Sequence, residues 1–201
     1  MSKKIILLIL IVGIGIIGYF SFNGNSVEIY IDGENVSSSS IISPTSGVNT
    51  DQLNMEICDY VFKNMDSTKG DGTTLKQDIQ RICAAHGLNN VNVRINSVLG
   101  ENKIPIQYHV DGKSMDPTLK DGQIVLVEKT KNIRVNDIVV ADSPEYGRII
   151  KRVNQINGDN VYLVSDNKNV TYERVNGALY ETKGITTWVN IDNIYGVAVE
   201  Y

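Results

Sequence analysis

Residues that build metal sites are scarce in this sequence. The 201 residues include 2 cysteines and 2 histidines, with neither a Cys-x-x-Cys pair nor a cluster of histidines. Since zinc in proteins is held chiefly by closely spaced Cys and His ligands, the sequence predicts no zinc site.

An excess of positive charge is also lacking. The chain has 19 Lys and Arg against 23 Asp and Glu, for a net charge of -4. Nucleic-acid binders usually carry a basic face, so we expect no nucleic-acid partner. The composition, 42% apolar and 21% charged, is typical of a globular protein, and the length fits one domain with extras or two small domains.

One long uncharged run stands near the N-terminus. Residues 5–22 read IILLILIVGIGIIGYFSF and follow Lys3 and Lys4. As a helix this run would span about 27 Å, close to the ~30 Å hydrocarbon core of a bilayer. The positive-inside rule then places both lysines in the cytoplasm and the chain after residue 23 outside it.

This run has three interpretations: a cleaved signal peptide, an uncleaved anchor or a buried core helix. It is longer than a usual signal-peptide core and no Ala-x-Ala-like site follows it, which favours the anchor. A core helix fits poorly, because the run is apolar on every face and lies at the terminus. Residues 1–23 are therefore predicted to be a cytoplasmic stub and membrane anchor of a single-pass cell-membrane protein, with residues 5–22 in the lipid bilayer.

The next segments are predicted to be a stalk and a helical pair. Residues 24–50 contain GENVSSSSIISPTSG, whose Ser, Gly and Pro content is typical of a linker, beside a short strand-like VEIYID. Apolar residues at helical spacing predict two helices within residues 51–90, and Gly87 is a favoured residue type just past a helix end. The apolar positions are Leu53, Ile57, Val61 and Met65 in the first helix and Leu75, Ile79, Ile82 and Cys83 in the second.

The two cysteines leave two interpretations open. In an extracytoplasmic domain Cys58 and Cys83 can form a disulfide. Both also lie on apolar faces of the predicted helices, so two buried free thiols fit equally well.

Residues 91–201 are predicted to form a mostly β domain. Alternation with a period of two runs through VNVRINSV, KIPIQYHV, QIVLVEK, DIVVAD, GRIIKRV and NVYLVSD. Asn176-Gly177 between alternating flanks predicts a hairpin. Short strands of this kind are typical of a sandwich or of coiled sheets in a partial barrel.

The loop VDGKSMDPTLKDG, residues 110–122, raises a chemical question. A serine nucleophile needs an exposed hydroxyl on a fixed backbone beside a base. Pro117 stiffens the loop, and Met115 and Leu119 can pin it onto the core, so Ser114 fits such a nucleophile. An ordinary polar turn is the alternative.

Two residues are candidate bases for Ser114. His109 lies in the preceding strand and has no evident acidic partner for a Ser-His-Asp triad. In GRIIKRVNQI, strand alternation puts Lys151 on one face with Ile149 and puts Arg152 on the other. A buried Lys151 would have a lowered pKa and could accept the serine proton. The alternative is an edge strand whose Lys-Arg pair discourages aggregation.

Four blocks, SMDPTLKDGQIVLVEK, NDIVV, IIKRV and GDNVYLVSDN, then follow in a familiar order and spacing. Over about residues 104–201 the chain resembles the serine peptidases that include type I signal peptidases and repressor-type autoproteases. The resemblance implies that Ser114 is the nucleophile and Lys151 the general base of a Ser-Lys dyad. The backbone N–H of Ser114 would help to bind the oxyanion, and no metal or cofactor is needed.

The resemblance also implies shallow apolar pockets that accept small side chains before the cleaved bond. The candidates for substrate contact are Met115, Pro117 and Ile149, and the candidates for supporting the dyad are Asp166 and Asn167. The sequence departs from the family where no Asp-Ser-Arg block follows SDN, and where Gly112 replaces the hydroxyl residue that some relatives use as a second oxyanion donor.

Within this superfamily, the predicted anchor and Pro117-Thr118 resemble signal peptidases rather than the cytoplasmic autoproteases with DNA-binding domains. The resemblance implies a membrane-anchored serine endopeptidase that removes signal peptides from secretory precursor proteins. Two alternatives stay open: a narrow-substrate or self-cleaving peptidase, and a non-catalytic surface binding module on the same fold.

Overall fold

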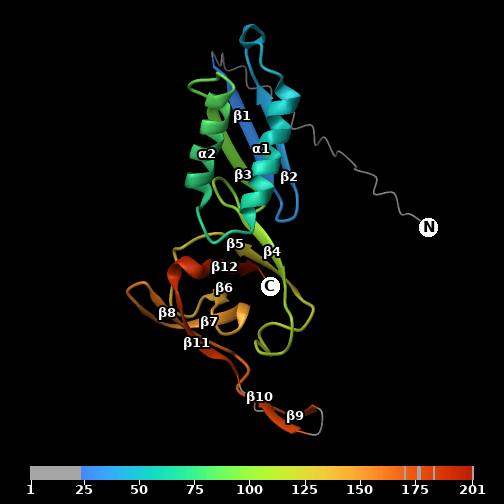
Figure 1. Cartoon of the computed structure of the whole chain (residues 1–201), viewed down its shortest axis with the longest axis vertical. Coiled ribbons are helices and arrows are strands. Elements are labelled where there is room, and N and C mark those ends of the chain that lie inside the picture. Colours follow the sequence, from blue (N-terminus) through green and yellow to red (C-terminus); the bar gives the residue numbers. More distant parts are fainter. Residues whose placement is uncertain (1–23, 170, 176–177, 183, 201) are drawn as a thin grey trace, which may run out of the picture.

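The structure is a computed structural model that describes residues 24–169, 171–175, 178–182 and 184–200. Helices packed on a small sheet form one end of the elongated molecule, and a β domain forms the other (Figure 1). The predicted anchor, residues 5–22, lies outside the described residues. No helix within the described part is long and apolar enough to cross a membrane.

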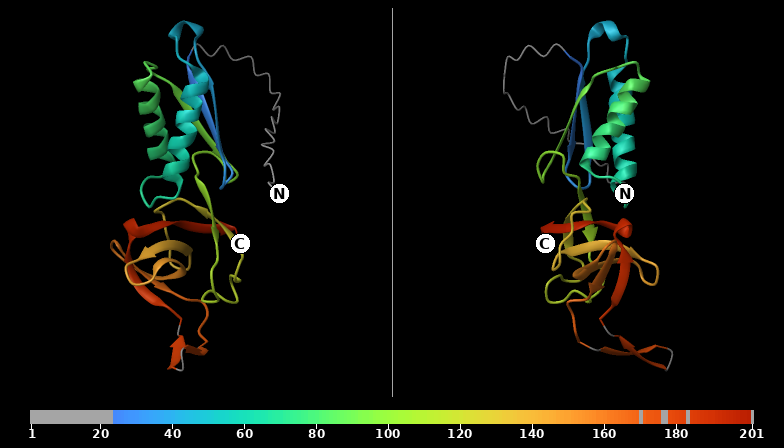
Figure 2. Two further views of the ribbon diagram at one scale, coloured as in Figure 1. Left: turned by 45° about the vertical axis from the view of Figure 1, so that its right-hand side comes forward. Right: turned by 90° about the vertical axis from the view of Figure 1, so that its left-hand side faces the viewer.

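The first part, residues 24–97, is an αβ unit. Its sheet has the order β2-β1-β3, in which the central β1 pairs antiparallel with β2 and parallel with β3. Both helices cover one face of this sheet (Figure 2). The elements are β1 (Ser26–Ile31), β2 (Val36–Ile41), the 3-10 helix η1 (Pro44–Ser46), α1 (Thr50–Met65), α2 (Gly72–Ala85) and β3 (Asn92–Ser97).

Local sequence signals explain both helices, which are confirmed. The Asn49 side chain caps α1 by accepting hydrogen bonds from the first backbone N–H groups, and Asp71 caps α2 in the same way. The apolar positions predicted for α1 are all buried, and those of α2 are buried or packed against the same core. Beyond α2, Gly87 has a φ of 77°, a left-handed conformation that favours glycine.

The prediction of a stalk over residues 24–50 was wrong. Val27, Ile29 and Ile31 alternate inward from β1 into the helix-covered core, and the serine-rich segment forms β2 along one edge of the sheet. The helices are therefore not a separate pair. The prediction that residues 91–98 belong to the β-rich domain was also wrong, because β3 completes the sheet of the αβ unit.

The cysteines are free thiols in the structure, as one of the two interpretations held. Cys83 is buried in α2 and Cys58 is half-buried in α1. Burial raises the pKa of both thiols, so both are unreactive near neutral pH.

The β domain begins at residue 105 and confirms the mostly β prediction. Its main sheet has seven strands in the order β11-β8-β7-β6-β12-β5-β4 and curls on itself (Figures 1 and 2). The strands are β4 (Pro105–His109), β5 (Ile124–Glu128), β6 (Ile138–Ser143), β7 (Gly147–Asn157), β8 (Asn160–Val164), β11 (Thr186–Asn190) and β12 (Ile194–Glu200), with the 3-10 helix η2 (Ile191–Asn193) before β12. Two apolar clusters fill the curl.

A separate hairpin extends from this sheet. β9 (Thr171–Val175) pairs antiparallel with β10 (Ala178–Thr182), which confirms the predicted hairpin. The turn residues Asn176 and Gly177 lie outside the described residues.

Gly196 in β12 is a point of close approach between two strands. A Cβ atom at this position would lie 2.0 Å from the carbonyl oxygen of Glu128 in β5. Because backbone cannot move as freely as a side chain, we expect Gly196→Ala to lower the free energy of unfolding by about 1–3 kcal/mol. Denaturant unfolding of the full chain in mild detergent, followed by the fluorescence of Trp188, would measure this change.

The matched control for this prediction is Gly24→Ala, since no heavy atom lies within 4 Å of a Cβ at that position. This control is expected to unfold like the wild type. An unchanged midpoint for Gly196→Ala would contradict the tight β5–β12 contact.

Candidate active site

The loop between β4 and β5 holds Ser114 on a fixed backbone. At its base, the N–H of Val110 donates to the Gln123 carbonyl and the N–H of Gly122 donates to the Val110 carbonyl, both over 2.8 Å. Met115 and Leu119 are completely buried in the core beneath. The loop is therefore a rigid platform on which Ser114 is half-buried.

Lys151 reaches this serine from β7. The Lys151 Nζ atom lies 2.8 Å from Ser114 Oγ and 2.8 Å from the carbonyl oxygen of Ile150. The lysine side of β7 points inward, so Lys151 is only 3% exposed. β7 lies between β6 and β8, which rules out the edge-strand interpretation of the Lys-Arg pair.

The environment of Lys151 favours its neutral form. Burial lowers the pKa of Lys151 from 10.5 to about 8, against a smaller opposing effect of the Asp166 charge. At pH 7 roughly a tenth of such amines are neutral, several hundredfold more than for an ordinary lysine. A neutral amine within hydrogen-bond distance of a hydroxyl can act as its general base.

The segment after β8 supports the serine loop. Asn167 donates from Nδ2 to the Lys113 carbonyl over 2.8 Å and from its backbone N–H to the Ser114 carbonyl over 3.0 Å. Asp166 accepts two hydrogen bonds from Arg152, at 2.7 and 2.6 Å, and one from the Thr118 hydroxyl. The Arg152 hydrogen bond holds the pKa of Asp166 below its usual value despite partial burial.

Arg152 has a role in the site that the sequence did not predict. Its guanidinium binds the carboxylate of Asp166 beside the serine loop. The only signal was its place on the face of β7 opposite to Lys151. That signal does not identify Asp166 as the partner of Arg152, because the register of the β7–β8 hairpin shifts between Val153 and Gln155 and cannot be counted from the turn.

A cleft of about 190 Å³ opens over Ser114 and Lys151. One wall comes from β4 and the residues after it, and the other from β6, β7 and Ile185. Ile149 lines this cleft, as predicted for a substrate contact. The remaining lining residues are Tyr108, His109, Val110, Asp111, Val140, Arg148 and Ile150.

Among the described residues, two candidate substrate contacts do not line the cleft, and the alternative base His109 forms no hydrogen bond with Ser114. Met115 is completely buried and Pro117 points to solvent, and neither lines the cleft. Met115 anchors the loop in the core, which confirms the other role predicted for it. His109 lines the cleft, but the described residues show no hydrogen bond between His109 and Ser114, whose side-chain partner is Lys151.

The described residues contain no group of three or more His, Cys, Asp and Glu side chains that could hold a metal ion. The Ser114 hydroxyl and the Lys151 amine at the base of the cleft are suited to nucleophilic attack and proton transfer.

Comparison with known proteins gives a family match and a relative of similar sequence. Residues 89–187 match the family described as Peptidase S24-like. The chain is also similar to signal peptidase I V of Bacillus subtilis (strain 168), with 34% identity over a 79-residue alignment that covers 37% of this chain and 47% of the relative. The chain thus spans about half the length of the curated relative that it matches.

The family match therefore covers just under half of the chain, the part that contains both Ser114 and Lys151. The resemblance to the serine peptidase superfamily that includes signal peptidases, first drawn from the sequence blocks around Ser114 and Lys151, is confirmed.

Proposed function

We propose that the chain is a serine endopeptidase with a Ser114–Lys151 dyad. The observation that supports it most directly is the 2.8 Å separation between Ser114 Oγ and the buried amine of Lys151. Lys151 takes the proton of Ser114 as Oγ forms a bond to the scissile carbonyl carbon. It then gives this proton to the leaving amine as the peptide C–N bond breaks, which leaves an ester on Ser114.

Water completes the cycle. Lys151, neutral again, takes a proton from a water molecule that attacks the ester carbonyl, and Ser114 leaves with that proton. The backbone N–H of Ser114 stabilises the oxyanion in both steps. The chemistry uses no metal or cofactor.

We propose secretory precursor proteins as the substrates. The similarity to a signal peptidase supports this class, and Val140, Ile149 and Ile185 make part of the cleft apolar. β4 is an edge strand of its sheet. Its Gln107 N–H donates to the Gly33 carbonyl over 3.3 Å, so an extended peptide would pair with the edge beyond residue 107, on the side of the serine loop. The apolar run of residues 5–22 would anchor the enzyme in the cell membrane, where signal peptides emerge on the extracytoplasmic side.

Cleavage of a model secretory precursor by the full chain in detergent tests this function. The wild type should cut after a small residue at the end of the signal peptide, as read by N-terminal sequencing of the product. Ser114→Ala should leave the precursor intact. The absence of cleavage by a folded wild type would refute signal-peptide removal.

The same samples separate the two alternatives. A shortened wild-type chain, absent from Ser114→Ala by intact mass, would show self-cleavage. A precursor that both proteins bind equally but neither cleaves would identify a binding module instead.

Asp166→Asn tests the support of the serine loop. The change weakens the bidentate pair with Arg152 and the hydrogen bond from Thr118, so we expect kcat to fall by about 10- to 100-fold through misplacement of the loop. It also removes a charge that raises the pKa of Lys151, so the pH midpoint of activity should move down. Steady-state cleavage across pH would measure both effects.

Asp159→Asn is the matched control, because Asp159 is exposed in the β7–β8 turn away from the serine loop. Its kcat is expected to equal that of the wild type. If Asp166→Asn behaved like this control, the proposed support would be refuted.

A further inference from the structure

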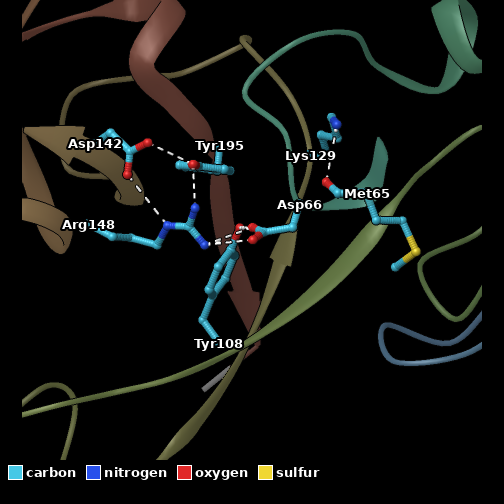
Figure 3. Close-up of polar contacts among 7 residues, drawn as sticks. All are labelled: Met65, Asp66, Tyr108, Lys129, Asp142, Arg148 and Tyr195. Atoms are coloured by element: carbon cyan, nitrogen blue, oxygen red, sulfur yellow. Dashed lines mark hydrogen bonds and ion pairs between the residues drawn. The ribbon is translucent and has the colours of Figure 1, made fainter. Parts of the chain in front are cut away.

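Asp66 reaches from the αβ unit toward the cleft of the β domain. It is the residue that follows α1, and its carboxylate accepts hydrogen bonds from two cleft residues (Figure 3). The Tyr108 hydroxyl donates to Asp66 over 2.9 Å, and Arg148 Nη1 lies 2.9 and 2.8 Å from the two carboxylate oxygens.

The two partners of Asp66 lie on different walls of the cleft. Tyr108 belongs to β4 and Arg148 to β7, and these strands are not neighbours in the sheet. Both side chains line the same cleft as Ser114 and Lys151. One carboxylate from outside the β domain therefore joins two walls that no β ladder joins directly.

Other contacts fix the Arg148 side chain. Its guanidinium donates to the Tyr195 hydroxyl and lies 4.1 Å from the centre of the Tyr195 ring, while Tyr195 donates to Asp142 over 2.7 Å. Arg148 Nε is 3.5 Å from Asp142. These contacts hold Arg148 against β6 and β12. Tyr108 lies near the same group, with its ring 5.7 Å from the Arg148 guanidinium and 6.1 Å from the Tyr195 ring, and Asp66 supplies the described hydrogen bonds that join Tyr108 and Arg148.

The end of α1 is itself anchored beside Asp66. Lys129, which follows β5 and is buried, donates from Nζ to the carbonyls of Asn64 and Met65 over 2.6 and 3.1 Å. Figure 3 shows the contact with Met65. A cation at this position also suits the negative end of the helix dipole. Asp66 is thus presented to the cleft from a fixed point.

We propose that Asp66 is a positioning residue that sets the separation of the two cleft walls through Tyr108 and Arg148, so that the αβ unit takes part in substrate binding. This inference rests on the proposed peptidase function. The Asp66 side chain is 53% exposed, and ion pairs this open contribute little to stability. We therefore expect the loss of the Asp66 carboxylate to change substrate affinity more than the free energy of unfolding.

Asp66→Asn tests the proposal. In the wild type, Tyr108 and Arg148 donate to two carboxylate oxygens, whereas the neutral amide has one acceptor oxygen. With the full chain in detergent and a model secretory precursor, we expect KM to rise about 5- to 10-fold and kcat to stay within about twofold. Asp66→Glu keeps the carboxylate and should recover most of the affinity. On an Arg148→Gln background, Asp66→Asn should add little, because the two residues act together.

Asp59→Asn is the matched control, since Asp59 is also an exposed carboxylate of the αβ unit and lies on α1 outside the cleft. It should leave KM unchanged. An unchanged KM in Asp66→Asn, or a failure of Asp66→Glu to restore it, would overturn the proposal.

Hydrogen–deuterium exchange gives a readout that needs no turnover. Asp66→Asn should speed exchange in residues 105–109 and 147–151, the two walls, while Asp59→Asn should not. Unchanged exchange would overturn the proposal whatever the kinetics show. Faster exchange combined with no cleavage by the wild type would refute the peptidase and still support the Asp66 contact.

Discussion

Lys151→Met is expected to reduce cleavage of a secretory precursor by at least about 10³-fold while the protein stays folded. Methionine has a similar length but no proton acceptor of useful strength, so Ser114 would lose the amine 2.8 Å from its hydroxyl. Product formation over long incubations would measure the residual rate.

The fold should tolerate this change because the buried lysine is itself unfavourable when charged. The lowering of the Lys151 pKa from 10.5 to about 8 means that the charged form is less favourable in the folded chain than in the unfolded chain by about 3 kcal/mol. Between these two pH values the unfolded chain binds more protons at this site than the folded chain, so this site makes the wild type more stable as pH rises. Lys151→Met removes the cost of burying the charged amine, so the variant should unfold at pH 7 no more easily than the wild type.

Lys120→Met is the matched control, since Lys120 lies in the same loop as Ser114, is exposed and pairs with Asp116. It should keep nearly full activity. Turnover by Lys151→Met at a rate close to that of this control would exclude Lys151 as the general base.

Activity is also expected to rise with pH. If the neutral form of Lys151 is required, kcat/KM should increase about tenfold per pH unit below the pKa and level off above it. The midpoint should fall near 8, the lowered pKa of the buried amine. Initial rates at low substrate concentration from pH 5 to pH 10 would give the profile.

A constant kcat/KM between pH 6 and pH 9, or a decrease over that range, would contradict a lysine base. Lys120→Met should reproduce the wild-type midpoint, because Lys120 does not contact Ser114. The expected shift in Asp166→Asn to a lower midpoint adds a second check, since the Asp166 charge acts on Lys151 in the opposite direction to burial.

Signals carried by neighbouring residues predicted much of this molecule. Fourfold spacing of apolar residues predicted α1, and twofold alternation predicted that Lys151 and Ile149 share one face of β7, but it did not decide which face is buried. The pairing of Lys151 with Ser114 could be inferred only from the family resemblance, because no local pattern shows how a sheet curls. The structure then brings the two side chains together.

Contacts between distant segments explain what the sequence did not predict. The serine-rich β2 has the composition of a linker, and only its ladder with β1 makes it a strand. β3 alternates like the strands of the β domain, so its pairing with β1 could not be recognised from its own residues. Asp66, Tyr108 and Arg148 come from three separate elements, and no short motif joins them.

Burial also decided which predicted site residues face the cleft. Ile149 and Met115 are both apolar and both lie near the dyad in sequence. Ile149 lines the cleft from β7, whereas Met115 points under the loop into the core. The direction of a side chain in an irregular loop has no period, so the sequence left two roles open for Met115: a substrate contact and an anchor of the loop in the core.

The measurement that tests the central claim most directly is an NMR titration of the lysine side chains in the full protein. Lys129 is also buried, with a pKa lowered to about 8, so two lysine signals should titrate near that pH. One of them should be absent from Lys151→Met, which assigns it to the candidate dyad. Loss of a signal that titrates near 8 would support a lysine able to activate Ser114 at neutral pH. Loss of a signal that titrates near 10.5 would contradict the proposed mechanism.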